Sequence, residues 1–318
     1  MKVVFMGSPD FAVPSLDALH KAGVDIPFCI TQKDAVSRNK RIPTAVKRCA
    51  SDLGIEVYEP DIINKDRSLI EKMKLESPDF LVVAAFGQII SKEILEIPKI
   101  AAVNVHASLL PKYRGAAPIQ RAVLEGAEET GVTIMKMAEG LDSGDMISFY
   151  TTEVGEKTSS ELFEELAKEG AKLLLETLCD ILKNGLKAKP QNEADASYAA
   201  KVSKEEGRID FNNSAIVEAR RVRAFSRVPG AFAFLNGDRI KVVRARAVDA
   251  KSNAPGEVLR ITQGDDCEIV VGCAEGALAI SKLQRSGKKE MGAADFLKGV
   301  HLTPGDIFTS YPISGSSI

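Results

Sequence analysis

Two side chains at the end of an apolar run can assist acyl chemistry. Asn104 and His106 belong to Ala102–His106, which reads as a β-strand. Residues two apart in a strand point to the same side, and ligands of open α/β sheets bind beyond the carboxyl ends of strands. An amide and an imidazole there can both donate hydrogen bonds to an oxygen that gains negative charge. The pair is a candidate oxyanion site, and the alternative is a polar strand end.

A carboxylate follows in a turn that contains glycines. The turn is Gly140-Leu141-Asp142-Ser143-Gly144-Asp145, and it comes just after the strand-like run Val132–Met137. Held by such a turn, Asp142 would orient His106 for proton transfer. The alternative is a solvent-exposed turn that only joins two strands.

The sequence lacks the usual motifs of several other kinds of functional site. The chain has no GxGxxG, no GxxxxGK[ST] and no GxSxG, so nucleotide-phosphate loops and a nucleophile elbow are absent. Ser108 beside His106 has no independent support as a nucleophile. The five cysteines form no CxxC pair and the three histidines are far apart, which argues against a disulfide framework or a zinc site. Direct transfer without a covalent enzyme intermediate fits best.

The elements that must position these residues alternate between strand and helix. Strand-like runs are expected at Lys2–Met6, Ile26–Thr31, Phe80–Ala85, Ala102–His106, Val132–Met137 and Met146–Thr152. Helical patterns are expected at Phe11–Ala22, Thr44–Leu53, Arg67–Leu75, Pro118–Glu125 and Ser159–Lys183. This alternation predicts an α/β domain with a mostly parallel, Rossmann-like sheet and helices on both faces.

The pattern changes after a polar stretch that contains Pro190. We expect a catalytic domain over 1–186, a linker over 187–205 and a second domain over 206–318. Short β-like runs follow the stretch, at Ala231–Leu235, Arg239–Ala245, Gly256–Ile261, Cys267–Val271 and Ala277–Leu283. Asn236-Gly237 predicts a tight hairpin turn, because both of its central positions need a positive φ. The run of short strands predicts a small β-barrel.

Charge and apolar content bound the class of protein. Residues 201–318 hold 18 Lys and Arg against 14 Asp and Glu, a net +4, and residues 1–200 hold 24 against 30, a net −6. The basic part permits a polyanionic partner, although such asymmetry also occurs in proteins that bind nothing charged. No apolar run reaches the roughly 18 residues of a membrane span. The opening MKVVFMGS reads as a strand rather than a targeting segment, which predicts a cytoplasmic protein.

Longer segments carry a family resemblance. The strings NVHASLLPKYRGAAPIQ (104–120) and GVTIMKMAEGLDSGDM (131–146) resemble, in order and spacing, the signature of folate-dependent formyltransferases. Four more strings, FMGSPDFAVPSL, FGQII, RVRAFSRVPGAF and LQRSGKKEM, are similar to the methionyl-tRNA formyltransferases within that family. The resemblance covers nearly the whole chain. It implies transfer of the formyl group of 10-formyltetrahydrofolate, without a metal, to the amino group of methionyl initiator tRNA for translation initiation.

The resemblance also implies roles for particular residues. Asn104, His106 and Asp142 match the catalytic trio of the family. The wall that binds folate corresponds to Phe86, Gly87, Gln88, Ile89, Ile90, Ser108, Leu109, Leu110 and Pro111. In the 32–43 loop, which is shorter than the family form and lacks its glycine flanks, the residues that enter the tRNA acceptor end would be Arg38, Lys40 and Arg41. The second domain resembles an OB-like tRNA-binding barrel, with candidate phosphate contacts at Arg220, Arg221, Arg223, Arg227, Lys282, Lys288 and Lys289. For each of these the alternative is a solvated surface charge.

Related activities share the trio and differ in the acceptor. Glycinamide ribonucleotide formyltransferase normally lacks the barrel domain. The amino-sugar formyltransferases and the hydrolase domain of formyltetrahydrofolate dehydrogenase usually depart from the string Ala116-Ala117-Pro118-Ile119-Gln120, which is present here. A non-catalytic tRNA-binding protein on a dead formyltransferase is a further alternative, and the intact trio argues against it. We expect a monomer without an obligate protein partner.

Overall fold

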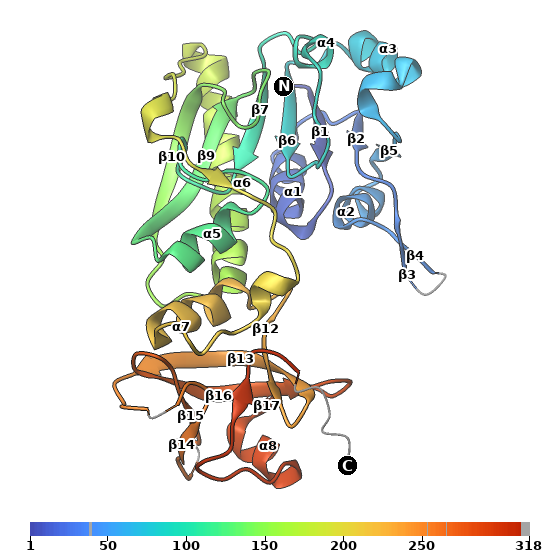
Figure 1. The fold of residues 1–318 in the computed structure, drawn as a ribbon. Coiled ribbons are helices and arrows are strands. Elements are labelled where there is room, and N and C mark those ends of the chain that lie inside the picture. The colour runs from blue at the N-terminus through green and yellow to red at the C-terminus, as the bar shows by residue number, and fades with distance from the viewer. Residues whose placement is uncertain (38–39, 253, 265, 313–318) are drawn as a thin grey trace. The chain divides into compact units, whose positions relative to one another are not determined.

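The structure is a computed structural model that describes residues 1–37, 40–252, 254–264 and 266–312 (Figure 1). The chain divides into two compact units. The first comprises residues 1–118, 129–153 and 163–200, and the second comprises residues 119–128, 154–162 and the residues from 201 onward.

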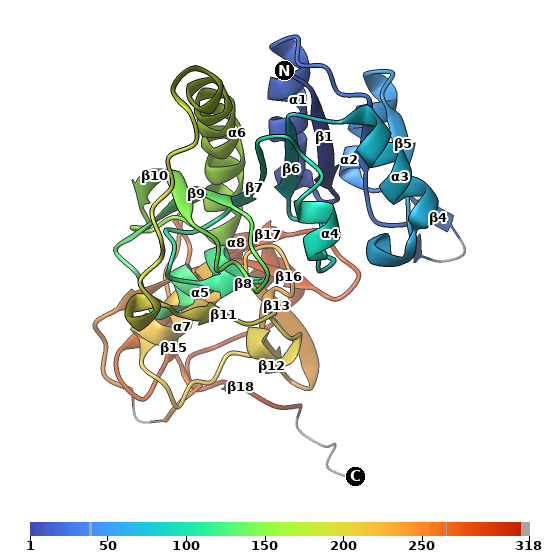
Figure 2. The ribbon, with the colours of Figure 1, turned by 90° about the horizontal axis from the view of Figure 1, so that it is seen from above.

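A seven-stranded sheet forms the centre of the first unit (Figures 1 and 2). Its strands, in spatial order, are β10 (Met146–Glu153), β9 (Glu129–Lys136), β7 (Ala101–His106), β6 (Phe80–Ala84), β1 (Val3–Gly7), β2 (Phe28–Ile30) and β5 (Glu56–Tyr58). The strands from β7 to β5 are parallel, whereas β9 and β10 run antiparallel to their neighbours. The expected mostly parallel sheet is confirmed. The sequence prediction missed β5, which is a short and only partly buried edge strand.

Helices cover both faces of this sheet. They are α1 (Val13–Lys21), α2 (Ala45–Asp52), α3 (Arg67–Glu76), α4 (Lys92–Leu95) and α6 (Ser159–Asn184), and a 3-10 turn at Asp10–Ala12 precedes α1. Leu69 and Met73 of α3 share a buried cluster with Val83 of β6. On α6, a Cβ built at Gly170 would lie 3.2 Å from side-chain atoms of Val105 and Val132. Val105 therefore faces α6 from the side of the sheet opposite to α3.

Two short pairings extend the first unit. β3 (Ala35–Ser37) and β4 (Lys40–Ile42) form a hairpin within the 32–43 segment. β8 (Arg114–Gly115) pairs in parallel with β11 (Tyr198–Ala199), and Lys189 exchanges backbone hydrogen bonds with Met146. Much of the expected linker, residues 187–205, therefore forms backbone hydrogen bonds with other segments of this unit. These bonds satisfy the polar groups of its extended backbone.

An antiparallel sheet forms the second unit. Its strands are β14 (Val258–Ile261), β15 (Ile269–Gly272), β16 (Ala277–Arg285), β13 (Asp238–Val248), β12 (Ala231–Leu235) and β18 (Phe308–Thr309), with β17 (Met291–Gly292) beside β16. A bridge between Glu257 and Ile307 joins the two edges, so the sheet curls on itself as the barrel prediction requires. Asn236 and Gly237 have φ of 51° and 83°, which confirms the predicted hairpin turn.

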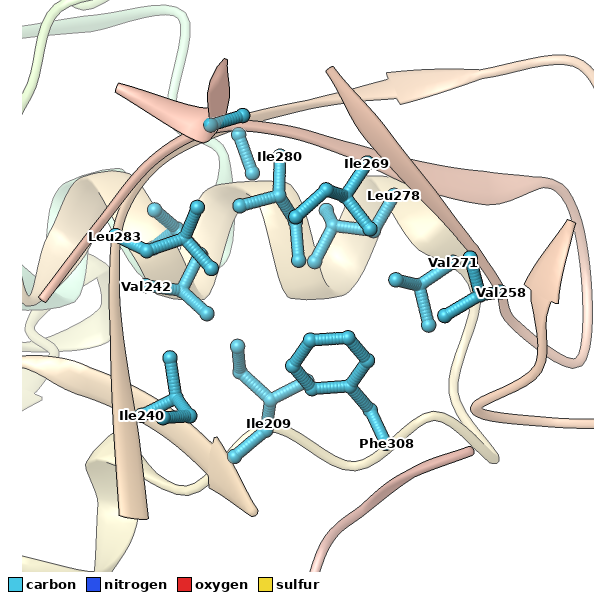
Figure 3. Close-up of a cluster of buried hydrophobic side chains, with 14 of the residues drawn as sticks. Ile209, Ile240, Val242, Val258, Ile269, Val271, Leu278, Ile280, Leu283 and Phe308 are labelled. Atoms are coloured by element: carbon cyan, nitrogen blue, oxygen red, sulfur yellow. The ribbon is translucent and has the colours of Figure 1, made fainter. Parts of the chain in front are cut away.

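The interior of the curled sheet is filled by apolar side chains (Figure 3). Ile240 and Val242 alternate inward along β13, and Ile269 and Val271 do so along β15. The helices α7 (Ala215–Ala224) and α8 (Ala293–Gly299) contribute further buried residues, and α5 (Pro118–Glu125) lies mostly in this unit. The second unit therefore has a core of its own.

None of the helices in the described ranges combines the length and the apolar character that a bilayer span requires. The five cysteines carry free thiols. Burial raises the pKa of the Cys29 and Cys273 thiols to about 12 in each case.

Candidate active site

The carboxyl end of β7 presents Asn104 and His106 on one face of the sheet. Both side chains are buried. Val105 between them faces α6, so Asn104 and His106 project from the opposite face, where Val83 is the register partner of Asn104 on β6. The sequence prediction that the two residues share a face agrees with this strand geometry.

His106 meets an acceptor oxygen at each ring nitrogen. Nε2 lies 3.0 Å from the carbonyl oxygen of Tyr113, and Nδ1 lies 3.6 Å from Oδ2 of Asp142. A carbonyl only accepts hydrogen bonds, so this network assigns a proton to Nε2. The neutral ring then presents a lone pair at Nδ1, and the protonated ring has a carboxylate beside it.

The turn between β9 and β10 places Asp142 inward. The backbone there is left-handed at Asp142, with φ of 49°, and Gly140 has φ of 118°. The Asp142 side chain is 15% exposed, whereas its neighbour Leu141 is 59% exposed. The N–H of Gly115 donates to Oδ2 of Asp142 at 2.8 Å. The alternative of a simple solvent-exposed turn fits Leu141 but not the carboxylate beside His106.

Residues 108–111 follow His106 after one intervening alanine. The hydroxyl of Ser108 is fully buried and donates to the carbonyl of Lys112 at 2.6 Å. This hydrogen bond gives the hydroxyl a structural role in the segment. The peptide bond between Leu110 and Pro111 is cis. Leu109 and Leu110 line an apolar cavity of about 360 Å³ together with residues from β9, from β10 and from the stretch after α6, namely Thr133, Met146, Ile147, Phe149, Thr151 and Lys189.

The other expected wall, residues 86–90, follows the end of β6. The carbonyl of Phe86 accepts from Ser8 Oγ at 3.3 Å and from Gln32 Nε2 at 3.1 Å. Oε1 of Gln88 accepts from the N–H of Ile63 at 2.9 Å, which fixes the loop from its other side. The side chain of Ile89 is 86% exposed. Because β6 and β7 are parallel neighbours, this loop and residues 108–111 emerge at the same edge of the sheet.

Three groups near His106 and Asp142 were not anticipated from the sequence. They are the Tyr113 carbonyl, the Gly115 N–H and the side chain of Gln191, which donates to the Asp142 carbonyl at 2.8 Å. Tyr113 has φ of 60° and Gly115 has φ of 121°. Main-chain groups and backbone angles of this kind leave no periodic signal in a sequence, and Gln191 lies far along the chain from the motif that it contacts.

Of the basic candidates in the 32–43 segment, the structure describes Lys40 and Arg41, both in β4. Arg38 lies outside the described residues, and Lys40 is the first residue of β4. Arg41 is exposed and pairs with Val36 across the hairpin.

The basic candidates of the second unit differ in what they contact. Arg221 donates to Oε2 of the fully buried Glu218 at 2.8 Å and to the carbonyl of Glu206 at 2.7 Å. Arg223 donates to the carbonyl of Gly155 and lies 3.7 Å from Glu156.

Most of the remaining candidates have exposed side chains. The guanidinium of Arg220 packs against Gly126, and Lys282 pairs with Glu290 at 3.3 Å. The side chains of Arg227, Lys288 and Lys289 are exposed. The structure thus separates candidates built into the unit from candidates displayed on its surface.

The chain matches two family models. Residues 1–178 match the family described as formyl transferase, and residues 201–301 match the family described as formyl transferase, C-terminal domain. The two matches fall on the segments that precede and follow the polar stretch around Pro190.

Comparisons with single proteins agree with the family models. A methionyl-tRNA formyltransferase of Agathobacter rectalis is 42% identical over 313 residues, which is 97% of this chain and 100% of that protein. The solved methionyl-tRNA formyltransferase of Clostridium thermocellum has a TM-score of 0.54 at 18% identity and covers 79% of this chain and 95% of its own. HypX of Aquifex aeolicus, solved in complex with tetrahydrofolic acid, has a TM-score of 0.65 at 19% identity over 97% of this chain and 50% of its own. These two structural likenesses concern the fold.

Proposed function

This chain belongs to the methionyl-tRNA formyltransferase family and transfers a formyl group to methionyl-tRNA, and we propose that Asn104, His106 and Asp142 carry the chemistry. We propose further that the donor is 10-formyltetrahydrofolate and that the acceptor is the initiator tRNA. The observation that supports this site best is the position of Asp142, whose Oδ2 is held by the Gly115 N–H at 2.8 Å and lies 3.6 Å from His106 Nδ1.

Asn104, His106 and Asp142 are assigned different roles according to the hydrogen bonds that each side chain can make. Asn104 Nδ2 donates to the formyl oxygen as that oxygen gains negative charge. With the His106 proton held on Nε2 by the Tyr113 carbonyl, Nδ1 is the atom that accepts the proton of the attacking methionyl amine. Asp142 then faces the protonated ring and stabilises its charge. The bond from the amine to the formyl carbon replaces the bond between that carbon and the leaving nitrogen, and His106 passes the proton to that nitrogen. No covalent enzyme intermediate forms.

The residues at the sheet edge fit a folate. When bound, the folate supplies the formyl carbon. The two proposed wall segments, 86–90 and 108–111, offer apolar surface, with Ile89 86% exposed and Leu109 and Leu110 lining a cavity. Gly87, with φ of 87°, permits the backbone to approach a flat ring closely. The anchoring of Phe86 and Gln88 to residues outside the loop keeps this wall in place.

At the level of domains, we propose that residues 1–186 carry catalysis, that residues 187–205 connect the domains, and that residues 206–318 bind tRNA. Arg38, Lys40 and Arg41 of the 32–43 segment are proposed to meet the acceptor end. We propose a monomeric cytoplasmic enzyme without an obligate protein partner. The net +4 charge of residues 201–318 supports the tRNA assignment, because phosphate contacts dominate the affinity of nucleic-acid binding.

The test is transfer of radiolabelled formyl from 10-formyltetrahydrofolate. Methionyl initiator tRNA, glycinamide ribonucleotide and an amino-sugar nucleotide compete as acceptors. Asn104→Ala is compared with Asn184→Ala, a matched change at the exposed end of α6. We expect label on the tRNA alone, a turnover loss of about 10²–10³-fold in Asn104→Ala and none in Asn184→Ala.

The other outcomes separate the parts of the proposal. Label on a different acceptor would keep the chemistry and overturn the acceptor. Absence of transfer to all three acceptors would favour a catalytically dead tRNA-binding protein. Equal activity of the two Asn→Ala variants would remove Asn104 from the site.

A further inference from the structure

A buried arginine lies next to the proposed active site without reaching its reacting atoms. The side chain of Arg114 is 2% exposed and is among the largest fully buried side chains. A buried charge is costly unless it is paired and hydrogen-bonded. The guanidinium makes two hydrogen bonds to Glu193, at 2.8 and 2.9 Å, and two to Oε1 of Gln191, at 2.8 and 3.0 Å. Glu193 raises the pKa of Arg114 further, so the charge persists.

Gln191 uses both ends of its amide. Its Oε1 accepts the two bonds from Arg114, and its Nε2 donates to the carbonyls of Asp142 and Gly144 at 2.8 and 2.7 Å. An amide side chain offers two acceptor positions and two donor hydrogens, so all four are engaged. Gln191 thereby connects a fixed buried charge to the turn that carries Asp142.

The turn needs such a connection because its backbone is unfavourable by itself. Asp142 is a non-glycine residue in the left-handed region, with φ of 49°. Gly144 is packed so closely that an added Cβ would lie 1.8 Å from the carbonyl oxygen of Lys136. Hydrogen bonds to the carbonyls of Asp142 and Gly144 hold the turn on either side of Ser143.

Asp142 is held at two points by neighbouring residues of β8. The Gly115 N–H holds the carboxylate directly, and Arg114 holds the carbonyl through Gln191. Pairing of β8 with β11, where Arg114 is opposite Tyr198, fixes the segment that carries Gln191 relative to the same strand. These contacts form a closed ring around Asp142.

We propose that Gln191 is a positioning residue that holds the Asp142 carboxylate at His106 for formyl transfer. The proposal rests on the proposed function of the Asn104, His106 and Asp142 site. The competing explanation is that Gln191 only satisfies the buried Arg114. The two explanations differ in which half of the amide matters.

The substitution Gln191→Glu separates the two halves. It keeps an oxygen for Arg114, and as a carboxylate it pairs with the guanidinium at least as well. It removes the Nε2 donor and turns an oxygen toward the carbonyls of Asp142 and Gly144. We expect kcat to fall by about 10–100-fold, because misplacing a catalytic group by about 1 Å can have that effect. The midpoint of thermal unfolding is measured alongside and should stay above the assay temperature, so that the fall in kcat is that of a folded protein.

The matched control is Gln263→Glu, the same change at an exposed position of the second unit. The readout specific to positioning is a double-mutant cycle with Asp142→Asn, measured by long incubation with labelled donor. If Gln191 acts through Asp142, Gln191→Glu has little further effect on kcat once Asp142 is replaced. If Gln191→Glu does not fold, Gln191→Met takes its place in the cycle. This change removes both the Oε1 acceptor and the Nε2 donor.

The outcomes are distinguishable from failure of the proposed function. A wild-type protein that formylates nothing overturns the proposed function itself. An active wild type with Gln191→Glu within about twofold of its kcat overturns only the positioning role. Full additivity in the cycle also overturns the positioning role. A purely structural effect of Gln191→Glu would lower kcat by the same factor whether or not the Asp142 carboxylate is present.

Discussion

At the scale of single residues, the proposed chemistry depends on which nitrogen of His106 holds the proton. The Tyr113 carbonyl at 3.0 Å from Nε2 leaves Nδ1 as the atom for proton exchange, 3.6 Å from Asp142. A neutral side chain in place of Asp142 would leave the protonated ring without its neighbouring charge. In the proposed mechanism, the Asp142 carboxylate therefore stabilises the transition state more than the resting protein.

The change Asp142→Asn tests this role. The amide oxygen of Asn can still accept from the Gly115 N–H, so the turn should persist. We expect kcat to fall by about 10²–10⁴-fold, the usual range for a general acid–base contribution. Steady-state kinetics with both substrates varied would measure it, beside Asp145→Asn in the same turn as the control. A change confined to a higher KM, with kcat unaltered, would assign Asp142 to binding instead.

At the scale of elements, several parts of the fold could be predicted from local pattern. The run Ala102–His106 predicted a strand that ends in the candidate pair, and β7 spans Ala101–His106. Asn236-Gly237 predicted a hairpin turn for a stated reason of backbone geometry, and both φ angles are positive. These features succeed because each depends on residues that are close in sequence.

Other elements depend on distant partners and left no local signal. β8 and β11 are two residues each and exist because they pair with one another. The stretch from 187 reads as a linker by composition, yet Gln191 donates to the turn of Asp142 across a sequence separation of 49. The same limit applies to the candidate site: Asn104, His106 and Asp142 could be proposed from the sequence, whereas the Tyr113 carbonyl, the Gly115 N–H and Gln191, which contact His106 and Asp142, could not.

The turn between β9 and β10 permits a test by packing. A Cβ at Gly144 would meet the Lys136 carbonyl at 1.8 Å, so Gly144→Ala must displace backbone. We expect a loss of about 1–3 kcal/mol of unfolding free energy, typical of overpacking, together with a lower kcat as Asp142 moves. Urea unfolding measures the first and formyl transfer the second. Gly299→Ala, with 3.7 Å to the nearest atom, should change neither.

The ion pair between Arg114 and Glu193 predicts a dependence of stability on pH. The hydrogen bond from Arg114 lowers the pKa of Glu193 below its ordinary 4.5. The pair's contribution is therefore present above pH 4.5 and is lost as the pH falls through the lower folded-state pKa. Thermal unfolding of the wild type and of Glu193→Gln should differ at neutral pH and converge in acid. A difference that persists unchanged in acid would exclude this pair as its source.

At the scale of the whole molecule, charge is distributed unevenly along the chain. Residues 1–200 carry a net −6 and residues from 201 onward a net +4. Within the second unit, Arg221 and Arg223 are engaged by Glu218, Gly155 and Glu156, so their removal would disturb the unit itself. The exposed Lys288 and Lys289 are better probes of a polyanion, because their side chains can be truncated without disturbing such a framework.

The double change Lys288→Ala with Lys289→Ala should weaken tRNA binding without disturbing the chemistry. Neutralising one phosphate fewer lowers the slope of log K against log salt by about 0.7–0.9, so the double change lowers it by about 1.4–1.8. The KM for tRNA should rise, and kcat at saturating tRNA should stay unchanged, because neither lysine belongs to the unit that carries Asn104, His106 and Asp142.

The matched control is Lys183→Ala with Lys187→Ala, which removes the same net charge from the first unit. If both double variants change the salt slope of tRNA binding equally, total charge governs the binding and not a contact at Lys288 and Lys289. A smaller change in the control variant supports a tRNA-binding surface on the second unit.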